Sequence, residues 1–75
     1  MFRIDRITNQ SNQVVARGGT GHLTGTRLVI HKYKNTKPLV TNKRYTIYTE
    51  ESRTFTGTLK TLQPEVLEFP DVREE

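Results

Sequence analysis

Four glycines lie within eleven residues of the chain, in the segment RGGTGHLTGTR from Arg17 to Arg27. A phosphate loop needs backbone N–H groups that converge at the N-terminus of a helix. Gly19, Gly21 and Gly25 are spaced one residue too widely for the dinucleotide fingerprint, and the segment that follows alternates like a strand. We therefore expect these glycines to provide positive φ angles in a long hairpin connection. The alternative is a mobile backbone that, flanked by two arginines, approaches an anionic partner.

Few residues of the chain are of types that could catalyse a reaction or bind a metal ion. His22 and His31 are the only histidines, cysteine is absent, and Asp5 is the only acid before residue 50. A metal or catalytic site would need further ligands or a partner carboxylate beside the imidazoles. The lack of cysteine excludes a thiolate zinc site, a thiol nucleophile and a disulfide. We expect a protein that is not an enzyme and that holds no cofactor.

Basic and aromatic residues offer a different chemistry. Lysine and arginine track phosphates, and tyrosine rings stack on unpaired bases. Tyr45 is assigned to the core, and the alternative for the cations is ordinary solvated surface. DNA, RNA and an acidic protein surface remain equally compatible partners. The residues predicted to bind nucleic acid are Arg27, Lys32, Tyr33, Lys34, Lys37, Lys43, Arg44 and Tyr48.

The charge is distributed unevenly along the chain. Residues 1 to 49 hold nine Lys or Arg against one acid, and residues 6 to 49 hold no acid at all. Residues 65 to 75 hold five acids against one arginine, and the whole chain carries a net charge of +4. A basic body with an acidic end indicates an anionic partner for the body, or an end that screens it.

The length and composition indicate one small domain. The chain has 75 residues, only 32% of them apolar, and no apolar run is longer than the three residues of Leu28-Val29-Ile30. This excludes a transmembrane helix, and the first residues lack the features of a secretion signal, so we expect a cytoplasmic protein with no membrane partner. We expect the domain to span residues 1 to 69 and an acidic, frayed tail to span residues 70 to 75.

Alternating segments rich in threonine, valine and tyrosine predict an all-β protein. In RYTIYTEESRTFTGTLKTL, a three-residue loop places Ile47 opposite Phe55 and Tyr45 opposite Gly57, which gathers the large apolar residues on one side. The predicted fold is a small SH3-like barrel of five or six short strands. An OB-type barrel is the alternative, although the segment from Lys34 to Lys43 contains Pro38 and leaves little room for the helix such barrels carry.

The hairpin YTIYTEESRTFTGTLKTL also resembles the first motif of Sm-like RNA-binding proteins, in which an alternating strand, a polar turn and a G-x-L strand follow one another. The likeness covers about a quarter of the chain and is architectural. Such proteins place this hairpin early and follow it with a second motif, whereas here only residues 64 to 75 remain. No RNA-contacting residue is carried over from that family.

A protein-interaction module, such as an inhibitor or adaptor on a larger assembly, is the alternative function. It would dock through an exposed strand edge or through Val66, Leu67 and Phe69. The sequence also leaves open self-association through an unpaired edge strand, either Phe2 to Ile7 or Glu65 to Phe69.

Overall fold

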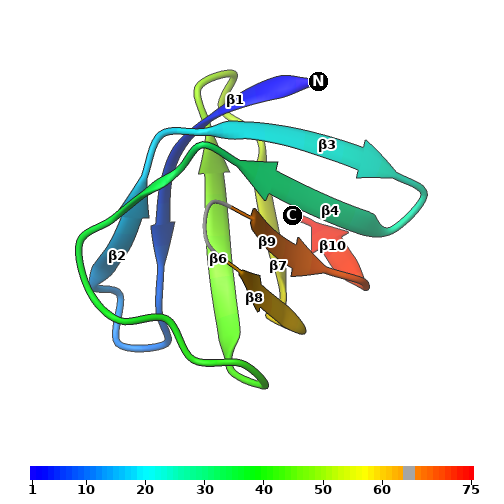
Figure 1. Ribbon diagram of the computed structural model, residues 1–75. Coiled ribbons are helices and arrows are strands. Elements are labelled where there is room, and N and C mark those ends of the chain that lie inside the picture. The colour runs from blue at the N-terminus through cyan, green and yellow to red at the C-terminus, as the bar shows by residue number, and fades with distance from the viewer. Residues whose placement is uncertain (64–65) are drawn as a thin grey trace.

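The computed structural model describes residues 1 to 63 and 66 to 75 and confirms an all-β protein (Figure 1). The described residues form ten strands and no helix, where five or six strands were expected. The strands are β1 (Phe2–Thr8), β2 (Val14–Arg17), β3 (Thr20–Thr24), β4 (Arg27–His31), β5 (Lys34–Asn35), β6 (Arg44–Thr49), β7 (Thr54–Thr58), β8 (Thr61–Gln63), β9 (Val66–Phe69) and β10 (Val72–Glu74).

All strand pairs are antiparallel, in the order β10-β7-β6-β1-β3-β4-β9-β8, and β2 joins β1 to β5. The first residues of β1 pair with β3, whereas its remainder lies between β2 and β6, so β3 and β4 cross β1 and β6 at a steep angle (Figure 1). Among the described residues no ladder joins β10 to β8. The predicted closed barrel is therefore replaced by a compact, open antiparallel sheet. One half consists of β1, β2, β5, β6, β7 and β10, and the other consists of β3, β4, β8 and β9. The start of β1 pairs with β3, and a backbone hydrogen bond from Val72 to Thr26 also joins the two halves.

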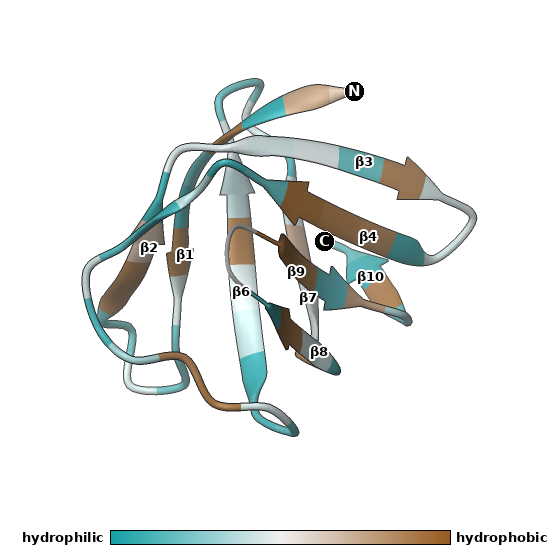
Figure 2. Ribbon diagram, in the orientation of Figure 1, coloured by the Kyte–Doolittle hydropathy of each residue, from teal (hydrophilic) through white to brown (hydrophobic). Residues whose placement is uncertain are grey.

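The core lies between these two halves. Hydrophobic bands interrupt the polar stretches along β1 and β6, as a strand with one buried face requires (Figure 2). Phe2 stacks on Phe55 with ring centroids 5.7 Å apart, and Tyr45 meets Phe69 edge to face at 6.4 Å. The largest fully buried side chains are Phe55, Phe69, Ile4, Ile7, Leu28, Ile30, Ile47, Leu59, Leu67 and Val15.

The hairpin of β6 and β7 confirms the predicted register. Ile47 lies opposite Phe55, and the backbone N–H of Thr49 donates to the carbonyl of Arg53 at 2.9 Å. The three loop residues include Ser52, whose φ of 67° supplies the left-handed conformation that glycine usually provides in such loops. The Thr49 hydroxyl also accepts the N–H of Arg53 at 2.9 Å, which closes the turn.

The glycine-rich segment contains a strand, β3, and not only a connection. Gly19 has a φ of 102° and turns the chain before β3, as expected for glycine. Gly21 instead lies within β3 and opposite Phe2, where a Cβ atom would come within 2.5 Å of the Phe2 ring. The close approach of backbone to an aromatic ring explains this glycine, which the sequence alone had placed in a loop.

The acidic end differs from the predicted frayed tail. Residues 72 to 74 form β10 along β7, and Val72 is only 6% exposed. Burial of this valine gives the end of the chain an apolar anchor. The expected end of a strand at Pro64 and the expected strand residue Glu65 lie outside the described residues.

The two segments expected to offer free edges are paired on both sides. β1 lies between β2, β3 and β6, and β9 lies between β4 and β8. Leu67 and Phe69 are fully buried, so the segment predicted to dock on a protein partner belongs to the core instead.

Candidate functional site

Four side chains form a row across the outer face of four neighbouring strands. Lys34 of β5 lies opposite Arg17 of β2, Arg17 lies opposite Arg6 of β1, and Arg6 lies opposite Tyr48 of β6. We call these four residues the basic row. Adjacent strands are about 4.8 Å apart, so the row sets three cations and a phenol ring side by side.

β1, β2 and β6 present their members of this row because the other faces of these strands are buried, whereas both residues of β5 are exposed. Ala16, Ile7 and Ile47, the neighbours of Arg17, Arg6 and Tyr48 along their strands, form the inner row of the same ladder and are fully buried. Successive side chains of a strand point to opposite faces, so burial of the inner row turns the basic row outward.

The charges of the basic row are poorly balanced. Like charges directly opposite each other on neighbouring strands are destabilising. Asp5 forms an ion pair with Arg6, with 2.6 Å between its Oδ2 atom and Nη1 of Arg6. Asp5 lies where the register of β1 against β6 shifts, between Ile4 and Arg6. In the described part of the chain, Arg17 and Lys34 have no carboxylate partner. These two adjacent cations are exposed to solvent.

Tyr48 is the aromatic member of the row. The guanidinium carbon of Arg6 lies 4.0 Å from the centroid of its ring, a cation–π contact. The side chain of Arg6 is 39% exposed, so the outer side of the stacked guanidinium remains accessible to solvent. An unpaired base can stack on an arginine plane as well as on a tyrosine.

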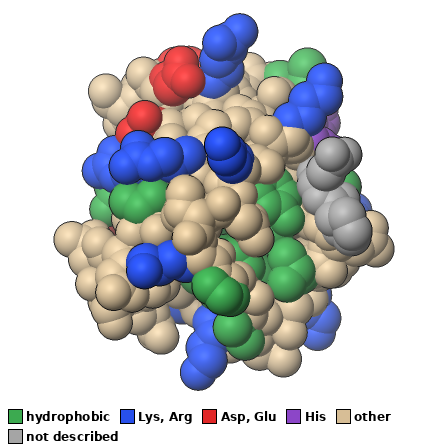
Figure 3. Space-filling view, turned by 60° about the vertical axis from the view of Figure 1, so that its left-hand side comes forward, with side chains coloured by type: hydrophobic (Ala, Val, Ile, Leu, Met, Phe, Trp, Pro, Cys, Tyr) green, Lys and Arg blue, Asp and Glu red, His purple; other side chains and the backbone are tan. Residues whose placement is uncertain are grey.

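Two further predicted cations, Lys37 and Lys32, are not members of the row. Lys37 follows β5, and its backbone N–H donates to the carbonyl of Val15 in β2 at 3.2 Å. Lys32 lines a shallow hollow of about 310 Å³ with Arg3, Gly19 and Glu50. On the side of the molecule that carries β2, lysine and arginine side chains are dispersed over the surface, while acidic groups are confined to one region (Figure 3).

The structure separates some of the predicted site residues from this surface. Arg27 lies on β4, in the other half of the sheet, and its side chain forms an ion pair with Glu68. Tyr33 packs against the core, and its hydroxyl donates to the carbonyl of Gln63 at 3.2 Å. Arg27 therefore already has a carboxylate partner, and Tyr33 serves packing.

Arg44 is the first residue of β6 and Lys43 immediately precedes it, away from the basic row. Arg44 shares the outer face of β6 with Tyr48, but the two are four positions apart, or about 13 Å along a strand. Lys43 lines a hollow between the turn at Ser11 and the loop at Pro38. Of the eight predicted residues, only Lys34 and Tyr48 are therefore members of the row.

The two histidines come together, which the sequence did not predict. β3 pairs with β4, so His22 and His31 line one surface hollow with Val29 and Arg27. No group of three or more His, Cys, Asp or Glu suited to a metal ion occurs among the residues that the structure describes. Among the described residues, His22 and His31 therefore have no third side chain with which to hold a metal ion.

Arg6 and Arg17 were missed as site residues. No acid lies between residues 6 and 49, so both belong to the same basic stretch that drew attention to Lys34. Their contribution depends on the pairing of β1 with β2 and of β2 with β5, and a short sequence segment does not specify pairing between such strands.

Protein-family models, curated protein sequences and solved structures were compared with the chain. None of them matches it. The described residues include no helix long and apolar enough to cross a membrane. The function is accordingly argued from the basic row and its surroundings.

Proposed function

We propose that the protein binds nucleic acid through the basic row, without catalysis. The observation that supports this most directly is the alignment of Lys34, Arg17 and Arg6 on adjacent strands, where among the described residues only Asp5 forms an ion pair with one of them. Repulsion within such a row lowers the stability of the free protein, and a phosphate backbone relieves it.

The chemistry of the row suits a backbone with unpaired bases. Arginine donates two parallel hydrogen bonds to a phosphate, and Lys34 adds a mobile charge at the end of the row. Beside the cations, the stack of Arg6 on Tyr48 offers a flat surface for a base. We therefore propose single-stranded DNA or RNA as the preferred ligand over a duplex.

Fluorescence anisotropy with labelled single-stranded and duplex oligonucleotides at 50 and 200 mM salt tests the proposal. Replacing both Arg17 and Lys34 with glutamine is expected to weaken binding and to lower the logarithmic salt slope by about two, one unit for each lost phosphate contact. Lys60→Gln is the matched control, because Lys60 is exposed and precedes β8, in the other half of the sheet. This control should bind almost as the wild type does.

A loss in the Lys60→Gln control about half as large as the loss in the Arg17/Lys34 variant, in proportion to the one and two charges removed, would contradict a defined interface and indicate attraction by net charge alone. Absence of binding at 50 mM salt would overturn the proposal. An acidic protein surface would then be the remaining partner for the row.

A further inference from the structure

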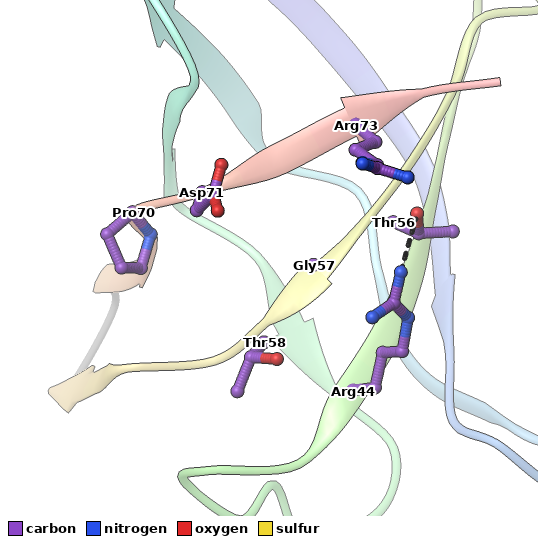
Figure 4. A pocket seen from close by; sticks show the side chains of 7 residues that line it. All are labelled: Arg44, Thr56, Gly57, Thr58, Pro70, Asp71 and Arg73. Carbon is purple, nitrogen blue, oxygen red and sulfur yellow. Dashed lines mark hydrogen bonds between the residues drawn. The ribbon is translucent and has the colours of Figure 1, made fainter.

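A second basic feature lies at the other end of the same outer face, between β6, β7 and β10. It is a groove of about 390 Å³ lined by Arg44, Thr56, Gly57, Thr58, Asp71 and Arg73 (Figure 4). This volume is within the range of small-molecule sites, at its lower end. The basic row does not include any of these residues.

Two arginines converge in the groove from opposite sides of β7. Arg73 lies opposite Thr56, and the Nη2 atom of Arg44 donates to the hydroxyl of Thr56 at 3.4 Å. Both guanidinium groups point toward Thr56, whereas Asp71 lies at the far end of the groove (Figure 4). Within the described residues neither arginine has an ion-pair partner.

We propose that this groove binds a phosphomonoester group. Arg44 donates to the Thr56 hydroxyl and the Arg73 guanidinium points toward the same residue, so the two like charges repel each other, and an anion between them removes that repulsion. A monoester carries a charge of nearly −2 at neutral pH and three acceptor oxygens, which matches two arginine forks and the hydroxyl of Thr56. A phosphodiester carries only one charge and suits the single-file cations of the basic row better.

The position of the groove relates it to the proposed function. Arg44 and Tyr48 share the outer face of β6, about 13 Å apart along the strand. The terminal phosphate of a nucleic acid strand that lies on the basic row is therefore within reach of the groove. This part of the inference rests on the proposed function, whereas binding of a small phosphomonoester or of inorganic phosphate does not.

Titration of the ¹⁵N-labelled full chain with inorganic phosphate at pH 7.5 and constant ionic strength tests the groove directly. We expect the largest amide shifts at Thr56, Gly57 and Thr58, and binding about tenfold or more weaker when Arg44 and Arg73 are both replaced by glutamine. Arg73→Lys keeps the charge but loses the two parallel N–H donors of arginine. Its affinity for phosphate should lie between those of the wild type and the double variant. Lys60→Gln, which lies outside both the groove and the basic row, is the control and should leave the phosphate shifts unchanged.

Shifts spread evenly over all basic residues, or shifts unaffected by the arginine substitutions, would overturn the inference. If the double variant fails to fold, Arg73→Lys and Thr56→Val take its place, and unchanged phosphate affinity in both would be equally negative.

Oligonucleotides with and without a terminal phosphate test whether the phosphate bound in the groove belongs to a nucleic acid terminus or to a small phosphate ester. Tighter binding of the phosphorylated strand, lost on replacing Arg44 and Arg73, supports a strand terminus as the ligand. Equal binding of the two strands together with groove-specific phosphate shifts supports a small phosphate ester. Loss of affinity for the unphosphorylated strand in the Arg17/Lys34 variant reports separately on the basic row.

Discussion

The guanidinium group of Arg53 donates two hydrogen bonds to the carboxylate of Glu74, one from Nε and one from Nη2, each 2.8 Å long. Arg53 follows the turn of the β6–β7 hairpin, and Glu74 is the last residue of β10. The same guanidinium lies 5.0 Å from the centroid of the Phe55 ring. The pair thus fastens the acidic end of the chain to the hairpin over the edge of the core.

This ion pair predicts a dependence of stability on pH. The hydrogen bond from Arg53 is the main cause that lowers the pKa of Glu74 below its usual value. Stability from the pair is therefore fully present above the unfolded-state pKa, about 4.3 for glutamate, and is lost as the pH falls through the lowered value.

Glu74→Gln should accordingly melt at a lower temperature than the wild type at pH 7, with the difference shrinking below pH 4. Glu75→Gln provides the control, since Glu75 has no ion pair in the described part of the chain. A difference between wild type and Glu74→Gln that stays constant from pH 7 to pH 3 would contradict this role for the pair.

Tyr48 should matter to ligand binding through its ring and not through its hydroxyl. Tyr48→Phe is expected to bind single-stranded oligonucleotides almost as tightly as the wild type does, because the stacking face is retained. Tyr48→Ala should lose about 1 to 3 kcal/mol of binding free energy. Anisotropy titrations measure both, and thermal melts establish that each variant is folded at the temperature used. Equal affinity of the alanine variant would remove Tyr48 from the interface.

Gly21 should tolerate alanine less well than Gly18 does. A Cβ atom at Gly21 would lie 2.5 Å from the Phe2 ring and 3.0 Å from the Ile4 side chain, whereas one at Gly18 would meet nothing within 4 Å. Overpacking typically costs about 1 to 3 kcal/mol. Gly18→Ala carries only the backbone strain of its positive φ, about 1 kcal/mol. Chemical denaturation should rank Gly21→Ala as the less stable variant, and the reverse order would argue against the β1–β3 packing.

β10 offers a matched pair of substitutions in adjacent residues. Val72 is 6% exposed and packs on Gly57, while Arg73 is exposed. Val72→Ser should lower the free energy of unfolding by about 1.5 to 3 kcal/mol, the value of burying such a side chain. Arg73→Ser should change it by no more than about 0.5 kcal/mol. If Val72→Ser and Arg73→Ser change the free energy of unfolding in urea by similarly small amounts, the end of the chain is frayed.

The parts of the fold that the sequence predicts correctly are those set by local alternation. Ile47 and Phe55 face each other because a period of two, read across a short loop, fixes the register of a hairpin.

The parts that the sequence does not predict depend on distant pairing. β3 was hidden because Gly21 resembles a turn residue until Phe2 is seen packed against it. The basic row was hidden because Arg6 and Arg17 become neighbours of Lys34 only through two ladders. Arg27 seemed a free cation because Glu68, its partner, lies far along the chain.

The pairing of β1 with β6 sets Ile4 opposite Thr49, so a large loop must close before the middle of the sheet exists. Closing such loops costs chain entropy before any contact compensates for it, and β proteins of this kind fold in roughly milliseconds to seconds. The ladder that places Tyr48 beside Arg6 is assembled only in that step, and the β1–β2 and β2–β5 ladders align the three cations. A chemically unfolded chain therefore keeps its net charge of +4 but loses the aligned array of cations. Comparing its affinity for anions with that of the native protein shows how much of the affinity comes from net charge and how much from the alignment of the cations.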